Sequence, residues 1–157
     1  MNGVEEAVGK IAGGVVAGRY TADFPEGTVV FLVGMRINRW RAVRDWLPAV
    51  RAMPRMIAEL QRQPERGFLG ARGWFGGRDL MVQQYWASMD QLLAYARDRD
   101  AEHLPAWGAF NRRVGKNPTV GIWHEAFTIH PDEAHVIYHH MPHVGLAAAS
   151  RRVAARH

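Results

Sequence analysis

The spacing of hydrophobic positions changes along the chain, and each change marks a predicted element. Residues 28–35 (TVVFLVGM) are almost continuously apolar and rich in β-branched side chains, which predicts a strand. Residues 41–61 carry apolar side chains about 3.6 residues apart, which predicts a helix with one buried face. Two prolines, Pro48 and Pro54, fall inside this helix. We expect them to bend or segment it, because proline removes a backbone donor and crowds the preceding turn.

Two further strands and a short helix are predicted next. Residues 67–75 and 79–87 are strand-like, and the Gly-Gly-Arg sequence between them (residues 76–78) is typical of a hairpin turn. Ser88 then begins a helix, and Gln91 lies three residues later, the spacing of a capping box.

A last helix and a long strand complete the predicted order. Asp100 is suited to cap a helix whose inner face carries His103, Trp107, Phe110 and Val114. Residues 119–130 predict a long strand, and a shorter one is expected around residues 136–138. The resulting order, β-α-β-β-α-β, predicts an α+β protein of the ferredoxin-like type.

Length and composition restrict the class of protein. A chain of 157 residues with 48% hydrophobic and 22% charged residues is a globular chain of about one domain. No run reaches the ~18 apolar residues of a membrane helix, and the absence of cysteine excludes disulfides and thiolate metal sites. We expect a cytoplasmic protein with no membrane partner. The predicted organisation is an arm over residues 1–17, one domain over 18–145 and a tail over 146–157.

Apolar residues on both faces of the predicted sheet indicate a second layer of protein. An antiparallel sheet with helices on one face and water on the other alternates apolar and polar positions. The strand over residues 28–35 does not alternate, and the strand over 79–87 has large apolar side chains on both faces. In so short a chain the natural cover is the sheet of a second copy. The sequence therefore predicts a homodimer, paired as a dimeric α+β barrel.

The net charge of +5 comes almost entirely from arginine. Such a charge suits nucleic acid or an anionic ligand. The densest group is Arg36, Arg39, Arg41 and Arg44, but acidic residues are interleaved along the chain and no nucleic-acid-binding motif accompanies them. A solvated basic surface, with no nucleic-acid partner, is the preferred interpretation.

Three ionisable residues are candidates for chemistry. His124 and Glu125 are neighbours in the predicted strand over residues 119–130, so they point to opposite faces and one of them meets apolar surroundings. A group in such a place is a candidate general acid or base, although a core histidine bonded to a backbone carbonyl fits the same pattern. His103, in the first turn of its helix, suits a neutral metal ligand, but the residue by itself favours a helix cap or a surface histidine.

A cluster of histidines follows the last long strand. It comprises His135, His139, His140 and His143. Their spacing suits a divalent metal, but few acidic residues accompany them, which favours a solvated loop.

The motifs together resemble a known family. The stretch from residue 18 to 145 contains GRYTA, VVFLVGMRIN, WLPAVRAMPRMIAEL, GFLGARGWF, QYWASMDQLLAYARD and VGIWHEAF. In these motifs it is similar to small actinobacterial and fungal proteins grouped as a monooxygenase family, related to the fumagillin-pathway polyketide monooxygenase. The resemblance implies membership of the dimeric α+β barrel superfamily, which includes cofactor-free monooxygenases and haem enzymes.

One segment also resembles the haem enzymes of that superfamily. Residues 103–127 (HLPAWGAFNRRVGKNPTVGIWHEAF) are similar to the C-terminal part of bacterial aldoxime dehydratases, in which a helical histidine binds haem iron and a strand histidine is the acid/base. The resemblance implies His103 as the ligand of a haem b and His124 as the acid/base. The other site residues carried over are Trp107 beside the cofactor, Glu125 after the histidine, and Ser88 and Arg36 in place of the dehydratases' serine and arginine.

Three functions stay open on this basis. The first is a haem-binding enzyme that acts on a small organic substrate by N–O chemistry or oxygen transfer. The second is a cofactor-free monooxygenase of secondary metabolism, in which His124 or Glu125 deprotonates an electron-rich substrate. The third is a non-enzymatic protein that binds an apolar ligand.

Overall fold

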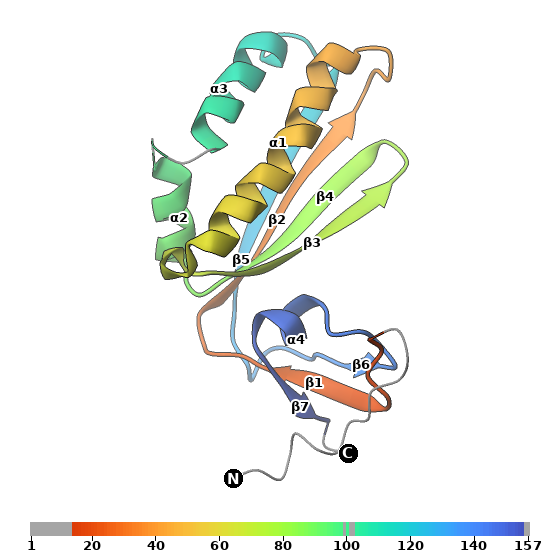
Figure 1. Cartoon of the computed structure of the whole chain (residues 1–157), viewed down its shortest axis with the longest axis vertical. Coiled ribbons are helices and arrows are strands. Elements are labelled where there is room, and N and C mark those ends of the chain that lie inside the picture. The colour runs from red at the N-terminus through yellow and green to blue at the C-terminus, as the bar shows by residue number, and fades with distance from the viewer. Residues whose placement is uncertain (1–13, 99, 101–102, 156–157) are drawn as a thin grey trace.

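The computed structural model describes residues 14–98, 100 and 103–155, and it contains two antiparallel sheets, one above the other along the long axis (Figure 1). The larger sheet has the order β3 (Phe68–Gly76), β4 (Asp79–Trp86), β2 (Thr28–Ile37), β5 (Val120–Ile129). The smaller sheet has the order β6 (Tyr138–His139), β1 (Arg19–Asp23), β7 (Arg151–Ala154). The larger sheet has the predicted ferredoxin-like arrangement, so the α+β fold class is confirmed.

Helices cover one face of the larger sheet (Figure 1). They are α1 (Val43–Arg62), α2 (Met89–Arg97) and α3 (His103–Val114), with a single 3-10 turn over Pro64–Arg66. A fourth helix, α4 (Gly145–Ala149), lies between the smaller sheet and one end of β3, on the opposite face of the larger sheet. None of the helices in the described residues is both long and apolar enough to cross a membrane.

Two clusters of buried side chains fill the space between the larger sheet and its helices. At one end of the strands, Trp86 is fully buried, and its ring lies against Phe68 and Tyr95 with centroids 5.5 and 5.6 Å away. At the other end, Met35, Ile37 and Val120 form a second buried cluster, which packs against α1 and α3. The middle of the sheet lies between these clusters.

The prolines of α1 do not segment it, because the helix continues through both of them. Pro48 has no N–H, so it leaves the carbonyl of Arg44, four residues earlier, without its helical donor. The guanidinium of Arg113, in α3, donates a hydrogen bond to this carbonyl. The proline therefore creates an attachment point for α3.

The predicted cap of α2 is present. The hydroxyl of Ser88 accepts a hydrogen bond from the backbone N–H of Gln91 at 3.2 Å. α3 begins at His103, and the N–H of Asp100 donates to the carboxylate of Asp98 at 2.9 Å. Residues 101–102 lie outside the described residues, so the cap of α3 by Asp100 stays a prediction.

The two ends of the chain meet in the smaller sheet. β1 pairs with β6 on one side and with β7 on the other. Tyr20 is fully buried there, and its hydroxyl donates to the carbonyls of Met141 and Pro142. The segment from residue 146, predicted as a tail, thus contributes most of α4 and all of β7, and the predicted arm is described only from residue 14, where Val16 is buried.

Candidate functional site

β5 presents two neighbouring ionisable residues to opposite faces of the larger sheet. His124 pairs with Val33 of β2 and lies on the face that the helices cover. Its ring is 5.9 Å from the ring of Phe31 and tilted by 53°. The imidazole is nevertheless exposed. His124 is therefore a polar group at an open position of an otherwise apolar, covered face.

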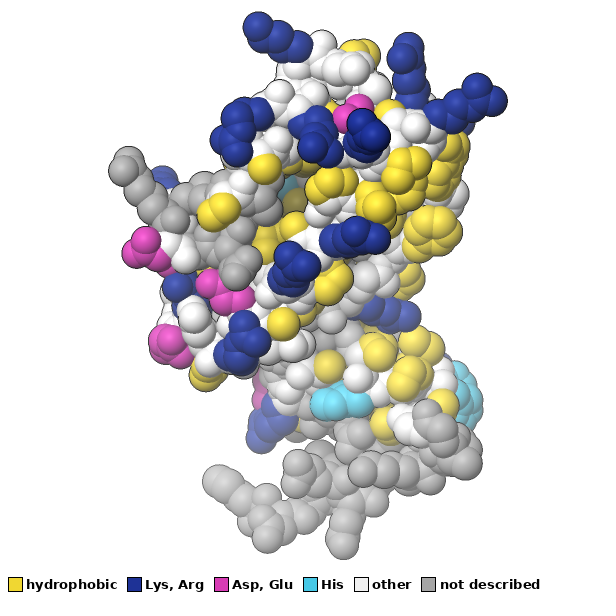
Figure 2. Space-filling model, turned by 45° about the horizontal axis from the view of Figure 1, so that its top comes forward, with side chains coloured by type: hydrophobic (Ala, Val, Ile, Leu, Met, Phe, Trp, Pro, Cys, Tyr) yellow, Lys and Arg dark blue, Asp and Glu magenta, His cyan; other side chains and the backbone are white. Residues whose placement is uncertain are grey.

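The walls around this position are apolar. Ile122 and Ala126 flank His124 on the same face of β5. On α3, the ring of Trp107 stacks on Phe110 with centroids 5.8 Å apart, and 46% of Trp107 stays exposed. A hollow opens between the helices on this side of the molecule, with hydrophobic side chains at its bottom (Figure 2). The arrangement suits a small, largely apolar molecule beside an accessible imidazole.

Glu125 lies on the face opposite α1, α2 and α3. It pairs with Leu32, and its same-face neighbours in β5 are Trp123 and Phe127, both exposed. Gly34 allows Trp123 to lie flat on this face, because a Cβ at residue 34 would be 2.4 Å from the indole. Glu125 therefore belongs to an apolar sheet surface and is separated from His124 by the sheet itself.

Arg36 and Ser88 are not brought to His124. Arg36 lies three residues after Val33 in β2, hence on the opposite face, where it forms an exposed ion pair with Asp79 at 2.8 Å. Ser88 lies beyond the far end of β4 and caps α2. Each of them has a structural contact instead: Arg36 pairs with Asp79, and Ser88 caps α2.

His103 is the first residue of α3, but its side chain lies outside the described residues. Its predicted role as a metal ligand therefore stays a prediction. The helix itself borders the hollow between the helices.

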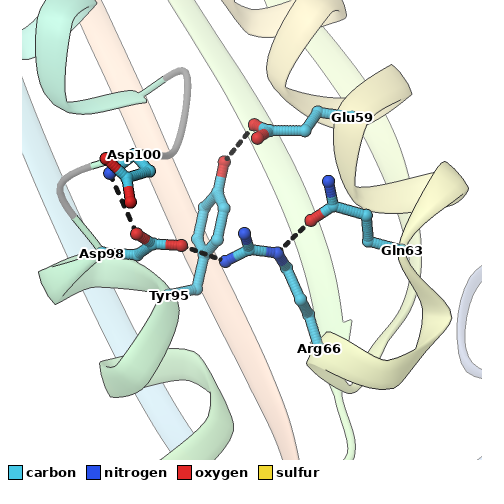
Figure 3. Close-up of polar contacts among 6 residues, drawn as sticks. All are labelled: Glu59, Gln63, Arg66, Tyr95, Asp98 and Asp100. Carbon is cyan, nitrogen blue, oxygen red and sulfur yellow. Dashed lines mark hydrogen bonds and ion pairs between the residues drawn. The ribbon is translucent and has the colours of Figure 1, made fainter.

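A polar network beside the hollow has no counterpart in the sequence analysis (Figure 3). Arg66 donates to Asp98 at 2.5 Å, and this hydrogen bond raises the pKa of Arg66 above its ordinary value. The hydroxyl of Tyr95 donates to the buried carboxylate of Glu59 at 3.4 Å, and burial followed by the charge of Glu59 raises the pKa of Tyr95. The network joins the end of α1 to the end of α2 and so fixes where the connection to α3 starts. No local pattern could have revealed it, since Arg66 and Asp98 are 32 residues apart.

The histidine cluster does not gather around one point. The rings of His139 and His140 stack with centroids 4.1 Å apart, and Nδ1 of His140 accepts from the N–H of Gly18 at 3.1 Å. His143 hydrogen-bonds the carbonyl of Ala147 at 2.6 Å. No group of three histidine, aspartate or glutamate side chains suited to a metal occurs among the described residues. His139 lies in β6, so this part of the segment is a strand and not the expected loop.

A family model matches most of the chain. The model described as "monooxygenase af470-like" matches residues 28–146, which include the whole larger sheet and its three helices. None of the curated proteins matches the sequence significantly.

Solved structures are similar in fold. An aldoxime dehydratase (OxdRE), in complex with butyraldoxime, superposes with a TM-score of 0.67 at 16% identity over 89% of this chain. This chain spans only 42% of that enzyme. A possible oxidoreductase from Bacteroides thetaiotaomicron has a TM-score of 0.50 at 13% identity and covers 67% of this chain and 100% of its own length. SnoaB, a cofactor-independent oxygenase from Streptomyces nogalater, has a TM-score of 0.48 at 17% identity, over 66% of this chain and 94% of its own.

Proposed function

Because the chain belongs to the monooxygenase af470-like family, we propose that it is an enzyme that acts on a small organic substrate by oxygen transfer or N–O chemistry. The observation that carries the proposal is the position of His124. It is an exposed imidazole on the covered face of the sheet, with Phe31 beside it and two buried clusters on either side. A side chain that served only the core would not stay open to solvent at this place.

His124 is proposed as the acid/base. Histidine takes up and releases a proton near neutral pH, which suits it to general acid/base chemistry. The apolar walls supplied by Ile122, Ala126 and Phe31 would exclude water from a bound substrate, which strengthens a hydrogen bond to the imidazole. The residues around His124 therefore support proton transfer to or from an oxygen or nitrogen atom of the substrate.

A haem b is proposed as the cofactor on the strength of the resemblance to aldoxime dehydratases. The chemistry of the described residues fits such a group, because Phe31 lies beside His124 and α3 presents the stacked rings of Trp107 and Phe110. His103 would hold the iron, and Trp107 would contact the ring. When bound, the haem would supply an iron that takes a substrate nitrogen or oxygen as a ligand.

The proposed enzyme is a homodimer whose larger sheets face each other. The face opposite α1, α2 and α3 exposes Trp74, Trp123 and Phe127, which is more apolar surface than isolated exposed side chains give. A second copy would cover it and complete the barrel predicted from the strand pattern.

The first experiment asks whether haem is bound. The protein is expressed with excess haem precursor, and its absorbance spectrum is compared with those of His103→Ala and of His135→Ala, an exposed histidine outside the hollow. We expect a Soret band that His103→Ala loses and His135→Ala keeps. An unchanged band in His103→Ala would assign the iron to another residue, and a colourless protein would favour the cofactor-free monooxygenase.

The second experiment asks whether His124 carries chemistry. Aliphatic aldoximes and oxidisable polyphenols serve as substrates, and Glu125→Gln is the matched control on the opposite face. We expect His124→Ala to cut turnover by ~10²–10⁴-fold without changing the spectrum of any bound haem, and Glu125→Gln to leave turnover nearly unchanged. The reverse result would make Glu125 the catalytic group. Activity that survives both changes would remove this strand from the mechanism.

A further inference from the structure

A groove between α1 and α3 contains four arginines. Its volume is about 420 Å³, within the range of small-molecule sites. Arg44, Arg51 and Arg55 come from α1, and Arg113 comes from α3. The three residues of α1 lie at positions i, i+7 and i+11, so they share one side of the helix. Basic side chains spread over this helical face, with hydrophobic ones between them (Figure 2).

These arginines have no acidic partners among the described residues. All four are exposed, and none forms an ion pair with a carboxylate of the described residues. Arg113 donates one N–H to the carbonyl of Arg44, and the other N–H groups of its planar guanidinium stay available. The network at the end of α1 shows the contrast, because Arg66 there is neutralised by Asp98 at 2.5 Å. Four like charges around one groove repel each other, so an anion placed among them is favoured.

The groove also has an apolar part. Leu47 and Ala52 line it between the arginines, on the same stretch of α1. Arg51 and Arg55 are four residues apart, and neighbours at this spacing on a helix can grip one carboxylate or phosphate together. A purely inorganic anion would leave the apolar part of the groove uncovered.

We propose that this groove binds an amphipathic organic anion, that is, an apolar chain or ring that ends in a carboxylate or a phosphate. The charged end lies between Arg51 and Arg55, with Arg44 and Arg113 beside it, and the apolar part lies on Leu47 and Ala52. The proposal rests on the groove alone and does not depend on the function of His124.

Calorimetric titration tests it with four probes at fixed salt: octanoate, octyl phosphate, octanol and inorganic phosphate. We expect the two amphipathic anions to bind at least about tenfold more tightly than octanol or inorganic phosphate, because only they use both parts of the groove. The ratio of octanoate to octyl phosphate then identifies the preferred headgroup. Equal binding of octanol, equal binding of inorganic phosphate, or no binding of either amphipathic anion would overturn the proposal.

A pair of double variants separates the groove from net charge. Arg51→Gln/Arg55→Gln removes two charges from the groove, and Arg62→Gln/Arg97→Gln removes two charges from exposed helix ends outside it. We expect the first to weaken octanoate binding about tenfold and the second to change it less than twofold. Equal weakening by both would show a nonspecific charge effect and overturn the site. Circular dichroism checks that both variants fold, which their exposed positions favour.

Discussion

Both faces of the larger sheet carry large aromatic side chains, but α1, α2 and α3 cover one face, whereas α4 covers only one end of the other. On the covered face Trp86 is fully buried between Phe68 and Tyr95. On the other face 45% of Trp74 and 51% of Phe127 are exposed. Residues of the same chemical type, in strands that pair directly, therefore have opposite surroundings.

The exposure of a side chain therefore has a different meaning on each face of the sheet. On the covered face His124 lies between two buried clusters, so its exposed imidazole indicates a place for a ligand. On the other face Tyr85 is buried, but Trp74, Trp123 and Phe127 are exposed together, which indicates assembly with another protein surface. Similar exposure thus supports chemistry on one face and association on the other.

Trp86→Ala breaks the covered face and has the largest expected effect. Removing a fully buried indole leaves a cavity among Phe68, Tyr95 and Leu60, which costs about 3–5 kcal/mol of the free energy of unfolding. Trp74→Ala, the control on the other face, is measured in a Phe127→Glu background, in which we expect a single chain. There it removes an exposed ring with a cation–π contact to Arg72 and costs about 1 kcal/mol or less. Urea unfolding at one protein concentration measures both. Equal losses would mean that the two faces do not differ as described.

Phe127→Glu tests the uncovered face. The wild type is expected to have about twice the chain mass of 17.7 kDa in light scattering, and a charge at residue 127 should return it to a single chain, because a buried unpaired carboxylate is costly. Phe75→Glu is the matched control, since Phe75 is also exposed but pairs with Leu80 on the other side of the sheet. A wild type that is monomeric at micromolar concentration contradicts the proposed dimer. So does a dimer that Phe127→Glu leaves intact.

Gly34→Ala tests the close approach of Trp123 to Gly34 on the same face. The added methyl group displaces the indole of Trp123, and we expect a loss of about 1–3 kcal/mol in the free energy of unfolding. The loss should shrink when Trp123 is replaced by alanine as well, because the clash is then absent. A double-mutant cycle measures this coupling. Additive losses would contradict the contact.

Tyr85 gives the smallest expected effect, in the pH dependence of stability. Burial raises the pKa of Tyr85 to about 12, whereas an unperturbed tyrosine has a pKa of about 10. The folded protein thus favours the neutral phenol, so the stability that this preference contributes is complete below pH ~10 and is lost as the pH rises toward 12.

Tyr85→Phe should therefore reduce the difference in urea midpoint between pH 9 and pH 11. At pH 9 it should cost about 1 kcal/mol, because the side-chain amide of Gln83 donates to the Tyr85 hydroxyl at 2.7 Å. A variant with an unchanged pH dependence would show that this phenol does not titrate as expected.

Periodicity predicted the larger sheet well, since the bounds of its strands and of α1 lie within two residues of those expected. It did not predict which face His124 takes, because β5 has apolar side chains at both odd and even positions. The pairing of His124 with Val33, whose face α1 and α3 cover, supplies that information. The same register places Arg36 and His124 on opposite faces of the sheet. The spacing of residues within one strand could not predict this separation without knowledge of where the helices lie.

Local sequence patterns could not predict the smaller sheet. β6 has only two residues, and its pairing joins Arg19 to His139, at nearly opposite ends of the chain. Polar contacts between distant segments, such as the one from Arg66 to Asp98, share this property. Such features depend on where the fold brings segments together and leave no periodic signal in either segment.

Pro48 has a consequence for the order in which the chain folds. The acceptor that it frees on Arg44 is used by Arg113, 69 residues later, so a local hydrogen bond of α1 is exchanged for a contact between distant segments. Distant contacts form late, because a long loop must first close. We therefore expect α1 to form before α3 docks on it. The helix that borders the hollow beside His124 would then be among the last parts to assemble and among the first to detach when the protein opens locally.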